Sequence, residues 1–567
     1  ADGYVFHSLM SGQFGAPANR ALSQWMDDCA HDCGYEHDNP LREVDWSRYD
    51  RSNLPADVRA RWEAAIARFF RAQTKATIAG EGRRRGINAS VVQEPADILS
   101  DPQLRARGFL RETELHDGQR GAVPDYFVQT DRGECQLPAA SPAPADPSFA
   151  TPRVPAQSTA GAPARSDALP LAGVRILDLS WALVGSLTTK ALADHGALVV
   201  KVESATRPCL TRTDVQVARS TRESFDDKPW FAHLNTSKLG LQLNIKHPRA
   251  REVLDPLLGW ADVVVENFSP GTLAKLGLDY AALRQRWPQL ILVSGSAYGQ
   301  TGPLAREWGV DGTGAALSGR LFLTGWPDRA PVVPASVPYG DVILPQLMVA
   351  ACAAALADRR RGAGGRQIDA AMYEACAQQM SAALVAAQLG APLIRSGNRE
   401  RGVLVQGVYP TRGEDRWIAI SIFDAGDWER SCACMGGVWP SAAELVAADG
   451  ALLDALDERI AAFTRGHEER ALMHTLQAHG IAAGVVQDPE DLLEHDPQLK
   501  TRGAFATLEH PVLGSFAHQA APHHLARTPA RVRTAPLLGQ HTEHVCRELA
   551  GLDPQLFAEL QREGVFV

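Results

Sequence analysis

The sequence has no excess of basic charge, and it lacks the basic clustering that nucleic-acid binding needs. It carries 57 Lys and Arg against 66 Asp and Glu, a formal net charge of −9. The run Arg359–Arg361 precedes Gly362, an arrangement more typical of a solvated helix end than of a phosphate-binding patch. We therefore expect no nucleic-acid partner.

Long apolar runs are lacking as well. No stretch approaches the ~18 uninterrupted apolar residues of a membrane-spanning helix. The first residues, ADGYVFHSLM, do not have the charged-then-apolar layout of a signal peptide. These features predict a cytoplasmic protein without a membrane partner.

Cysteine is sparse and unevenly spaced. Nine cysteines, an odd number, are spread from Cys29 to Cys546, which is more typical of reduced thiols than of a disulfide framework. The close pairs, Cys29 with Cys33 and Cys432 with Cys434, have neither the spacing nor the histidine neighbours of a zinc site. The sequence thus predicts no metal site.

What the chain does have is length and a clear internal boundary. With 567 residues, 45% of them hydrophobic, it exceeds the usual size of one domain. Residues 137–170 form a Pro/Ala/Ser-rich stretch of a composition that cannot bury enough apolar surface to fold, so they indicate a linker. The segment before it, 1–136, is polar and should contain a helix over 58–85.

After the linker the pattern becomes an alternation of apolar strands and amphipathic helices. It predicts an α/β fold with a Rossmann-like, doubly wound parallel sheet over 171–395, with ligand sites at the carboxyl ends of the strands. The expected strands are 173–180, 197–204, 239–246, 262–268 and 290–299, and the expected helices are 184–195, 248–260 and 279–287. A smaller α+β domain over 396–515 and a helical return to the large domain over 516–567 should follow.

The N-terminal segment repeats part of the expected small domain. IARFF…GINASVVQEPADIL (66–99) matches IAAFT…GIAAGVVQDPEDLL (460–493) at a constant offset of 394 residues. After one inserted residue, DPQLRARG (101–108) matches DPQLKTRG (496–503). Repeats of this kind indicate duplicated structural units. We expect residues 1–136 to be a partial duplicate of the small domain, to complete an interface and to have a part in shaping the acid pocket.

Asp341 is the strongest catalytic candidate. Pro334, Pro338 and the Tyr339–Gly340 pair interrupt regular structure just before it, and an apolar helix is expected over 344–357. A carboxylate at a helix start is ordinarily a capping or first-turn residue. The motifs around it favour a catalytic role instead.

Those motifs resemble one family when they are taken in order. They are LDLSWALVGSLTTKALADHGALVVKVE (177–203), LNTSKLGLQLNIK (234–246), VVVENFSPGTLAKLGLDY (263–280), SGSAYGQTGP (294–303), YGD (339–341) and GGRQIDAAMYEA (364–375). Together they resemble the class III CoA-transferases, the family of formyl-CoA transferase, carnitine CoA-transferase and α-methylacyl-CoA racemase. The resemblance implies an interlocked homodimer that uses an acyl-CoA and a carboxylic acid as its small-molecule substrates.

The resemblance also implies the chemistry of Asp341, which occupies the PxGD position of the family. There the aspartate attacks the donor thioester to give a mixed anhydride, the released CoA thiolate converts this to an aspartyl-CoA thioester, and the acceptor acid then takes over the CoA. A carboxylate suits this role because only an acid can form an anhydride. Coenzyme A enters as a substrate, and no metal is implied.

The CoA-contacting positions implied by the resemblance lie in three stretches. One follows the first strand, one is an N-x-x-K segment, and one is an NFxPG turn with a basic residue after it. The residues are Leu183, Val184, Asn235, Lys238, Asn267, Phe268, Ser269 and Lys275. Taken singly, each also has an ordinary interpretation as a turn asparagine, a core phenylalanine or a solvated lysine.

Several positions depart from the family pattern. Val184-Gly185-Ser186 replaces a frequent Ala-Gly-Pro, and Ser204 replaces a frequent arginine. Trp308 stands near a position that is basic in formyl-CoA transferase, and the tetraglycine loop of that enzyme is not found near Asn398. Formyl or oxalyl specificity is therefore not predicted.

Three alternatives to simple transfer stay open, and the donor and acceptor acids are not specified. The racemase branch pairs the aspartate with a histidine in a G-H-D segment, and this chain has Gly309-Val310-Asp311 there, so transfer is favoured over α-proton exchange. CoA transfer coupled to a lyase step, and a non-catalytic acyl-CoA-binding protein, are the other two.

Overall fold

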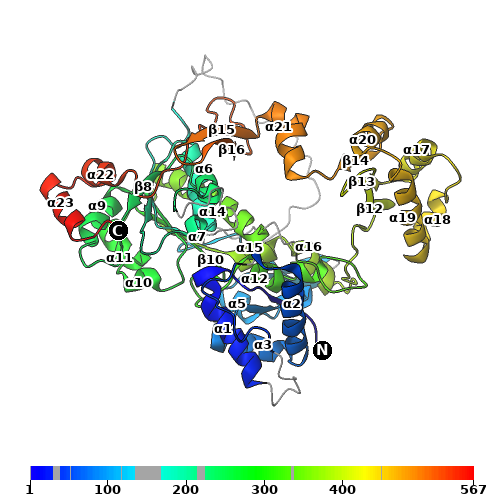
Figure 1. Cartoon of the computed structure of the whole chain (residues 1–567), viewed down its shortest axis with the longest axis horizontal. Helices are drawn as coiled ribbons and strands as arrows, with labels where there is room; N and C mark the ends of the chain where they lie inside the picture. Colours follow the sequence, from blue (N-terminus) through cyan, green and yellow to red (C-terminus); the bar gives the residue numbers. More distant parts are fainter. Residues whose placement is uncertain are drawn as a thin grey trace. The chain divides into compact units, whose positions relative to one another are not determined.

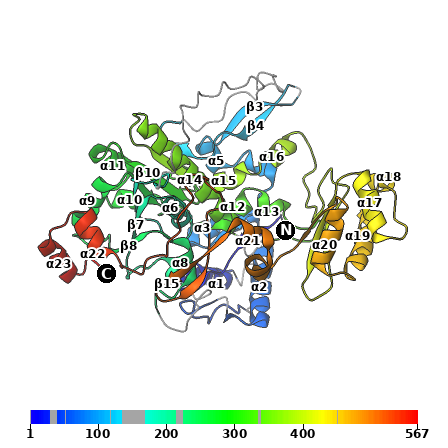
Figure 2. The ribbon, with the colours of Figure 1, turned by 90° about the horizontal axis from the view of Figure 1, so that it is seen from above.

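The computed structural model describes residues 2–29, 39–50, 53–116, 118–133, 168–213, 224–333, 338–448 and 450–567 (Figures 1 and 2). The predicted linker, apart from residues 168–170, lies outside these residues. The chain divides into two compact units. The first comprises Ala1–Phe322, Val333–Leu393 and Ala504–Val567, and the second comprises Leu323–Val332 and Ile394–Gly503.

These units differ from the predicted domains in two respects. The N-terminal segment belongs to the first unit together with the large sheet, instead of standing apart from it. The second unit ends at Gly503, before the predicted boundary at 515, because the hairpin of β15 (Phe505–His510) and β16 (Gly514–Gln519) belongs to the first unit.

A seven-stranded sheet forms the centre of the first unit, in the order β5-β11-β10-β9-β6-β7-β8. Strands β6 to β11 are parallel, and β5 joins antiparallel to β11. From β6 onward this is the Rossmann order 3-2-1-4-5-6, which confirms the predicted parallel sheet. The strands are β5 (Gln129–Thr130), β6 (Arg175–Asp178), β7 (Leu198–Glu203), β8 (Leu239–Gln242), β9 (Val263–Glu266), β10 (Ile291–Ser296) and β11 (Gln367–Ala371).

Helices cover both faces of this sheet, and alternate strand residues face opposite cores. Ile176 packs with α6 (Val184–Asp194), α14 (Tyr339–Arg360) and α15 (Met372–Gln378). Leu177 packs on the other face, whose helices are α9 (Arg251–Trp260), α11 (Tyr280–Arg286), η5 (Val545–Leu549) and α23 (Pro554–Arg562). Burial on both faces explains why the strands are almost wholly apolar.

Helix α14 is long and apolar enough to cross a membrane by length and composition alone. Its apolar residues Leu344, Met348 and Cys352 are fully buried in the core between the helix and the sheet. These residues of α14 therefore serve its packing on the sheet.

The N-terminal segment has its own core of buried tryptophans and phenylalanines, including Trp25, Trp62 and Phe69. The single helix predicted over 58–85 is wrong, because two helices occupy that stretch. The side chain of Thr74 accepts a hydrogen bond from Thr77 N at 3.1 Å and starts the second helix anew. The elements are β1 (Val5–His7), α1 (Gly12–Asp28), α2 (Ala56–Arg71), α3 (Lys75–Arg85), β2 (Ala89–Val91), α4 (Pro95–Ile98), α5 (Pro102–Ala106), β3 (Leu110–His116) and β4 (Gln119–Pro124).

The second unit is an antiparallel sheet covered by helices around buried Ile418, Ile420 and Trp428. Its strands are β12 (Val405–Pro410), β13 (Trp417–Ile422) and β14 (Ala482–Val485). Its helices are α17 (Ala425–Met435), α18 (Ala442–Val446), α19 (Gly450–Thr464), α20 (Glu469–Ala478), η4 (Asp491–His495) and α21 (Pro497–Arg502).

Two strand pairs, one near each end of the chain, share one register. In β1–β2, Val5 pairs with Val91 and Phe6 with Ser90; in β13–β14, Ile418 pairs with Val485 and Ala419 with Gly484. Val91 and Val485 differ by the offset of 394 residues found in the sequence repeat. Phe6 therefore stands at the register position of Ala419, and His7 at that of Ile420.

A buried ion network attaches the N-terminal segment to the sheet. The fully buried guanidinium of Arg107 donates to both carboxylate oxygens of Glu374 on α15 and, at 2.8 Å, to Asp369 on β11. The hydroxyl of Tyr126 donates to the same Glu374 at 2.8 Å. Bidentate pairing satisfies charges that would otherwise be costly to bury.

We predict that Arg107→Ala destabilises the first unit by about 3–5 kcal/mol, because it leaves the buried carboxylates of Glu374 and Asp369 uncompensated. Arg502 is the matched control, since it occupies the same place in the repeated DPQL motif but is exposed. Arg502→Ala should change stability by less than about 0.5 kcal/mol. Urea unfolding followed by circular dichroism measures both, and equal losses would contradict the role of the network.

Candidate active site

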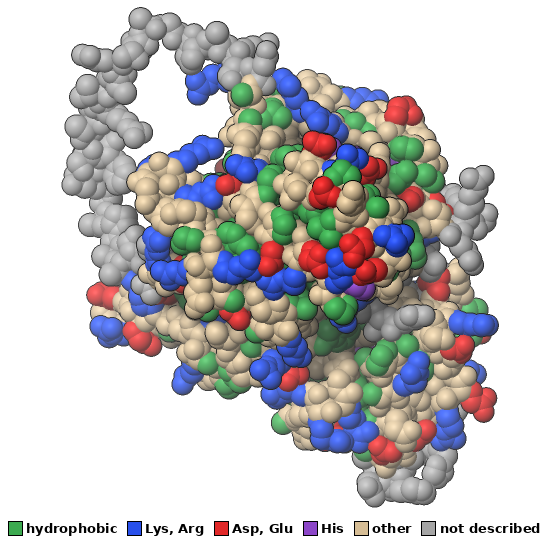
Figure 3. Space-filling model, turned by 90° about the vertical axis from the view of Figure 1, so that its left-hand side faces the viewer, with side chains coloured by type: hydrophobic (Ala, Val, Ile, Leu, Met, Phe, Trp, Pro, Cys, Tyr) green, Lys and Arg blue, Asp and Glu red, His purple; other side chains and the backbone are tan. Residues whose placement is uncertain are grey.

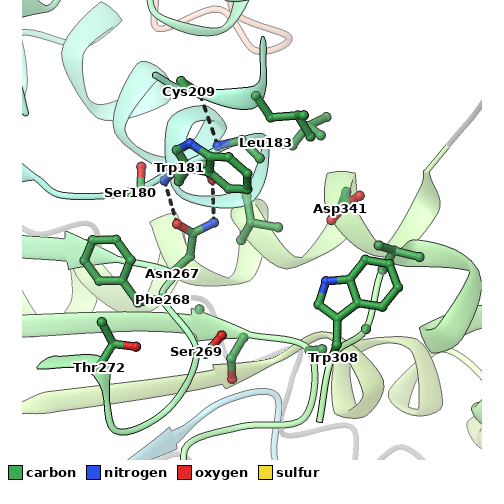
Figure 4. Close-up of a pocket in the computed structure, with 18 of the residues that line it drawn as sticks. Ser180, Trp181, Leu183, Cys209, Asn267, Phe268, Ser269, Thr272, Trp308 and Asp341 are labelled. Atoms are coloured by element: carbon green, nitrogen blue, oxygen red, sulfur yellow. Dashed lines mark hydrogen bonds between the residues drawn. The ribbon is translucent and has the colours of Figure 1, made fainter. Parts of the chain in front are cut away.

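The first unit contains a cavity of about 1420 Å³ at the carboxyl ends of the sheet strands. The loops after β6, β7, β8, β9 and β10 all contribute to its lining. Figure 4 labels residues from the loops after β6, β7, β9 and β10. It includes the crevice between β6 and β9, where the strand order reverses. Ligands bind at this place in doubly wound sheets, so the cavity lies where the sequence predicts a site.

Asp341 lies in the first turn of α14 and lines this cavity. No described residue donates a hydrogen bond to its carboxylate, so the capping role considered from the sequence is not the one it has. Burial, and then the neighbouring Asp311, raise the pKa of Asp341 to about 7. The result is a carboxylate with both oxygens available and a higher basicity than usual.

Asp311 performs the capping that Asp341 does not. It begins helix α12 (Asp311–Leu317), and its carboxylate accepts a hydrogen bond from the backbone N–H of Gly340. Burial raises the pKa of Asp311 against the opposing effects of that bond and of Arg320. Asp311 therefore fixes the start of α14 and also places a second carboxyl group beside Asp341.

Close packing leaves room for no side chain at position 340. A Cβ atom on Gly340 would lie 2.7 Å from Cγ of Met372 and 3.0 Å from the Asp311 carboxylate. Trp308 also lines the cavity, near Asp341 (Figure 4). The glycine of the YGD motif is thus required for the approach of Asp311 and Met372 to the catalytic candidate.

The loop after β6 is held to the loop after β9 by one side chain. Asn267 Nδ2 donates to the carbonyl of Trp181, and Trp181 N donates to Asn267 Oδ1, both at 2.7 Å (Figure 4). The next residue, Ala182, has a φ of 58°, a left-handed conformation that is strained for alanine. This clamp positions Leu183 and Val184 at the start of α6.

Most of the site residues expected from the sequence lie together in the cavity lining. These are Leu183, Val184, Asn267, Phe268, Ser269, Lys275 and Asp341. Phe268 also packs against the core on one face of the sheet, so the ordinary interpretation of that residue holds in part. Val310, at the histidine position of the racemase branch, lines the cavity with a side chain that cannot transfer protons.

Asn235 and Lys238 are corrections, because both are buried away from the cavity lining. Lys238 Nζ donates to Asn235 Oδ1 at 2.8 Å, to Ser186 O at 3.0 Å and to Asp178 at 3.1 Å. Burial lowers the pKa of Lys238 to about 8, although Asp178 opposes the shift. All three donors of the ammonium group are engaged, so the phosphate contact expected of Lys238 is replaced by a structural one.

Two basic residues in the lining were missed by the sequence analysis. Arg207 reaches the cavity because the turn after β7 pairs Ser204 with Arg207. The chain thus has an arginine three residues after position 204, where the family arginine is missing. Lys246 follows β8 and also lines the cavity. Its place at the end of the LNTSKLGLQLNIK motif was a signal that could have identified it.

Residues of the N-terminal segment line the cavity too, and no motif indicated them. Phe6, His7, Ser8, Met10 and Glu63 all contribute. They are separated from Asp341 by more than 270 residues of chain, so only the docking of the segment onto the sheet brings them there. Among the described residues, no group of three or more His, Cys, Asp and Glu side chains is arranged to hold a metal ion.

Comparison with known proteins agrees with this geometry. The sequence model of CoA-transferase family III matches residues 36–146 and 171–542. A probable CoA-transferase from Mycobacterium tuberculosis is 28% identical over 515 residues, which are 88% of this chain and 63% of that protein. The chain thus spans less than two thirds of the length of this relative.

Two further relatives are covered almost entirely. Succinyl-CoA–D-citramalate CoA-transferase from Chloroflexus aurantiacus is 30% identical over 402 residues, 70% of this chain and 98% of that protein. The crystal structure of a CAIB/BAIF family protein from Brucella suis matches with a TM-score of 0.59 and 26% identity, over 67% of this chain and 99% of the other. These matches confirm the resemblance found in the motifs, and the chain belongs to CoA-transferase family III.

Proposed function

We propose that this protein transfers CoA from an acyl-CoA donor to a carboxylic acid, with Asp341 as the covalent carrier. The observation that carries the proposal is the state of Asp341. Its carboxylate lines a large cavity, accepts no hydrogen bond from a described residue, and has a pKa raised to about 7. A raised pKa makes a carboxylate a better nucleophile once it is ionised. Membership of the family supports the same reaction.

The transfer proceeds in four balanced steps. An oxygen of Asp341 attacks the thioester carbonyl carbon, forming a C–O bond and breaking the C–S bond to release CoA thiolate. The thiolate attacks the Asp341 carbonyl carbon of the anhydride, which releases the donor acid as its carboxylate. The acceptor carboxylate then attacks the aspartyl thioester, and the released thiolate attacks the acceptor acyl carbon and frees Asp341. No net proton is gained or lost.

The charge of the cavity orients the CoA. Its lysines and arginine, Arg207, Lys246 and Lys275, come from the loops after β7, β8 and β9, whereas α14 packs beside β10 and β11. Neighbouring strands are ~4.8 Å apart, so β10 and β7, three steps apart in the sheet order, are roughly 14 Å apart. The CoA phosphates then lie over β7–β9, and the thioester reaches across to Asp341.

We also propose that the N-terminal segment is a partial duplicate of the second unit. The order of helices and strands supports this, because it is the same in both. Helices α2 and α3 and strand β2 correspond to α19, α20 and β14, and α5 corresponds to α21. The shared register of β1–β2 and β13–β14 points the same way. A duplicated small domain would explain why the N-terminal segment folds around its own core and also docks on the sheet.

Asp341→Ala should reduce transfer by about a thousandfold or more, because it removes the nucleophile. Binding of free CoA, measured by calorimetry, should be unchanged, since the Asp341 carboxylate is assigned to the acyl carbon and not to the CoA phosphates. The exposed Asp328 supplies the control, and Asp328→Ala should retain the wild-type rate. A residual rate above about one hundredth of wild type in Asp341→Ala would contradict the covalent role.

Activity should also depend on pH in a defined direction. Because the pKa of Asp341 is about 7, kcat/KM should fall about tenfold per pH unit below about pH 7, where the carboxyl group is protonated and not nucleophilic. Asp311→Asn removes a neighbouring charge and keeps an oxygen to accept from Gly340 N, so it should move the midpoint to lower pH. A midpoint that stays in place or rises in this variant argues against coupling of the two carboxyls.

Lys275→Ala tests the orientation of CoA. It should lower kcat/KM for an acyl-CoA by roughly tenfold and leave kcat/KM for the corresponding acyl-pantetheine unchanged, since only the former carries the nucleotide phosphates. The exposed Lys500 in the second unit provides the matched control. If acyl-pantetheine turnover falls equally, Lys275 has a role other than phosphate binding.

A further inference from the structure

We propose that strand β1 and the residues after it form the acyl-binding wall of the cavity, and that this wall selects apolar monocarboxylic acids over dicarboxylic acids. The inference rests on the proposed CoA transfer and names the class of acid that takes part in it. It is carried by the position, the rigidity and the charge of three N-terminal residues, Phe6, His7 and Met10.

Phe6 is connected to Asp341 through a short series of contacts. A Cβ atom on Gly312 would lie 2.0 Å from the tip of the Phe6 ring, so the ring packs directly on the backbone there. Gly312 follows Asp311, whose carboxylate holds the N–H of Gly340, the residue before Asp341. The N-terminal wall therefore lies beside the reacting carboxyl group, at the end of the cavity away from the basic loops.

Backbone pairing makes this wall rigid. Strand β1 pairs with β2, and Val92 N donates to Tyr4 O at 2.9 Å. Just beyond β2, Gln93 N donates to Ala316 O of α12 at 3.0 Å. The strand pair is thus joined to the same helix that Asp311 begins, so the wall and the catalytic group are held in one framework.

The wall is apolar or neutral. Phe6 and Met10 from the N-terminal segment line the cavity together with Trp308, Leu344 and Met372. His7 Nδ1 lies 2.7 Å from the carbonyl oxygen of Asn88 and donates to it, and burial lowers the pKa of His7 to about 4. The imidazole is therefore uncharged at neutral pH. Such a lining favours an alkyl or aromatic acyl group.

The charges at this end of the cavity are negative. Asp311, Glu63 and Glu307 are in the described lining, and so is Glu203 at the end of β7, which is paired with Arg212 at 2.9 Å; the Lys and Arg residues of the lining belong to the loops after β7, β8 and β9. Arg320 is the cation near Asp311 and opposes the rise that burial causes in the pKa of Asp311, but it lies 4.1 Å over the ring of Tyr339 and outside the lining. Among the described lining residues, none at this end is a Lys or Arg that could pair with the second carboxylate of a dicarboxylic acid, which disfavours the binding of such an acid.

The corresponding strand of the second unit shows which features are particular to the wall. At the register positions of Phe6 and His7, strand β13 has Ala419 and Ile420. Strand β13 shares the register but not the aromatic ring and the imidazole. This comparison also shows that an alanine is compatible with the strand pair, so Phe6→Ala should fold.

The test compares hexanoate with adipate, acids of equal chain length that differ by one carboxylate. With one acyl-CoA donor, wild-type kcat/KM should be at least about tenfold higher for hexanoate. Phe6→Ala should raise the KM for hexanoate about tenfold and leave the dissociation constant of free CoA unchanged. Phe127 is exposed in the same segment and outside the lining, so Phe127→Ala is the matched control.

A second variant keeps the test independent of the packing of Phe6. Met10→Lys introduces a cation into the wall and should shift the hexanoate-to-adipate ratio toward adipate by about tenfold or more. A wild-type preference for adipate would overturn the inference, as would equal effects of Phe6→Ala and Phe127→Ala, or a Met10→Lys variant with unchanged selectivity.

Failure of this inference can be told apart from failure of the proposed function. If adipyl-CoA and adipate are preferred and turnover still requires Asp341, the proposed CoA transfer is supported and only the assigned acid class is wrong. If no acyl-CoA is turned over with any acid and Asp341→Ala has no effect, the proposed function itself fails.

Discussion

The hydrogen bond from the Gly340 N–H to the Asp311 carboxylate is the interaction on which the rest of the site depends. It caps α14 with a residue from another helix, which leaves Asp341 free of a capping role although it stands in the first helical turn. It also places a second carboxyl group beside Asp341, which adds to the effect of burial in raising the pKa of Asp341 to about 7. Structure and reactivity thus have a common origin.

The sheet and the N-terminal segment together determine what can approach this group. The sheet presents basic residues in the loops after β7, β8 and β9, and the N-terminal segment adds Phe6, His7, Met10 and the acidic Glu63 to the lining. The Arg107–Glu374 pair and the added edge strand β5 make the segment part of the same unit. On the face drawn in Figure 3, acidic and basic side chains are interspersed, so strong charge separation is a feature of the cavity and not of that surface.

The sequence predicted the sheet and the position of Asp341, because both follow from local patterns. Apolar runs such as 262–268 have the composition of doubly buried strands, and glycine and proline mark the start of α14. It did not predict the break at Thr74, where a single capping hydroxyl outweighs continuous helical propensity. Nor could it place Lys238, since a lysine in a motif has the same local sequence whether its ammonium group binds a phosphate or a buried aspartate.

The contribution of Phe6 and His7 was hidden for a different reason. Contacts between residues so distant in sequence arise only when the N-terminal segment docks on the sheet, and no periodicity records them. The sequence repeat predicted a counterpart of the segment in the second unit, but it could not indicate which residues would face the cavity. The cavity lining shows that Phe6 and His7 face it, and the strand register places Ala419 and Ile420 at the same positions of the second unit.

Oxygen-isotope transfer tests the central claim, that Asp341 carries the acyl and CoA groups in turn, most directly. Turnover with an acceptor acid labelled with ¹⁸O in its carboxylate leaves one labelled oxygen on Asp341, and this oxygen passes to the donor acid released in the next cycle. Mass spectrometry should therefore find ¹⁸O in the released donor acid and in the peptide that contains Asp341. Unlabelled donor acid together with an unlabelled Asp341 peptide after many turnovers would contradict the account.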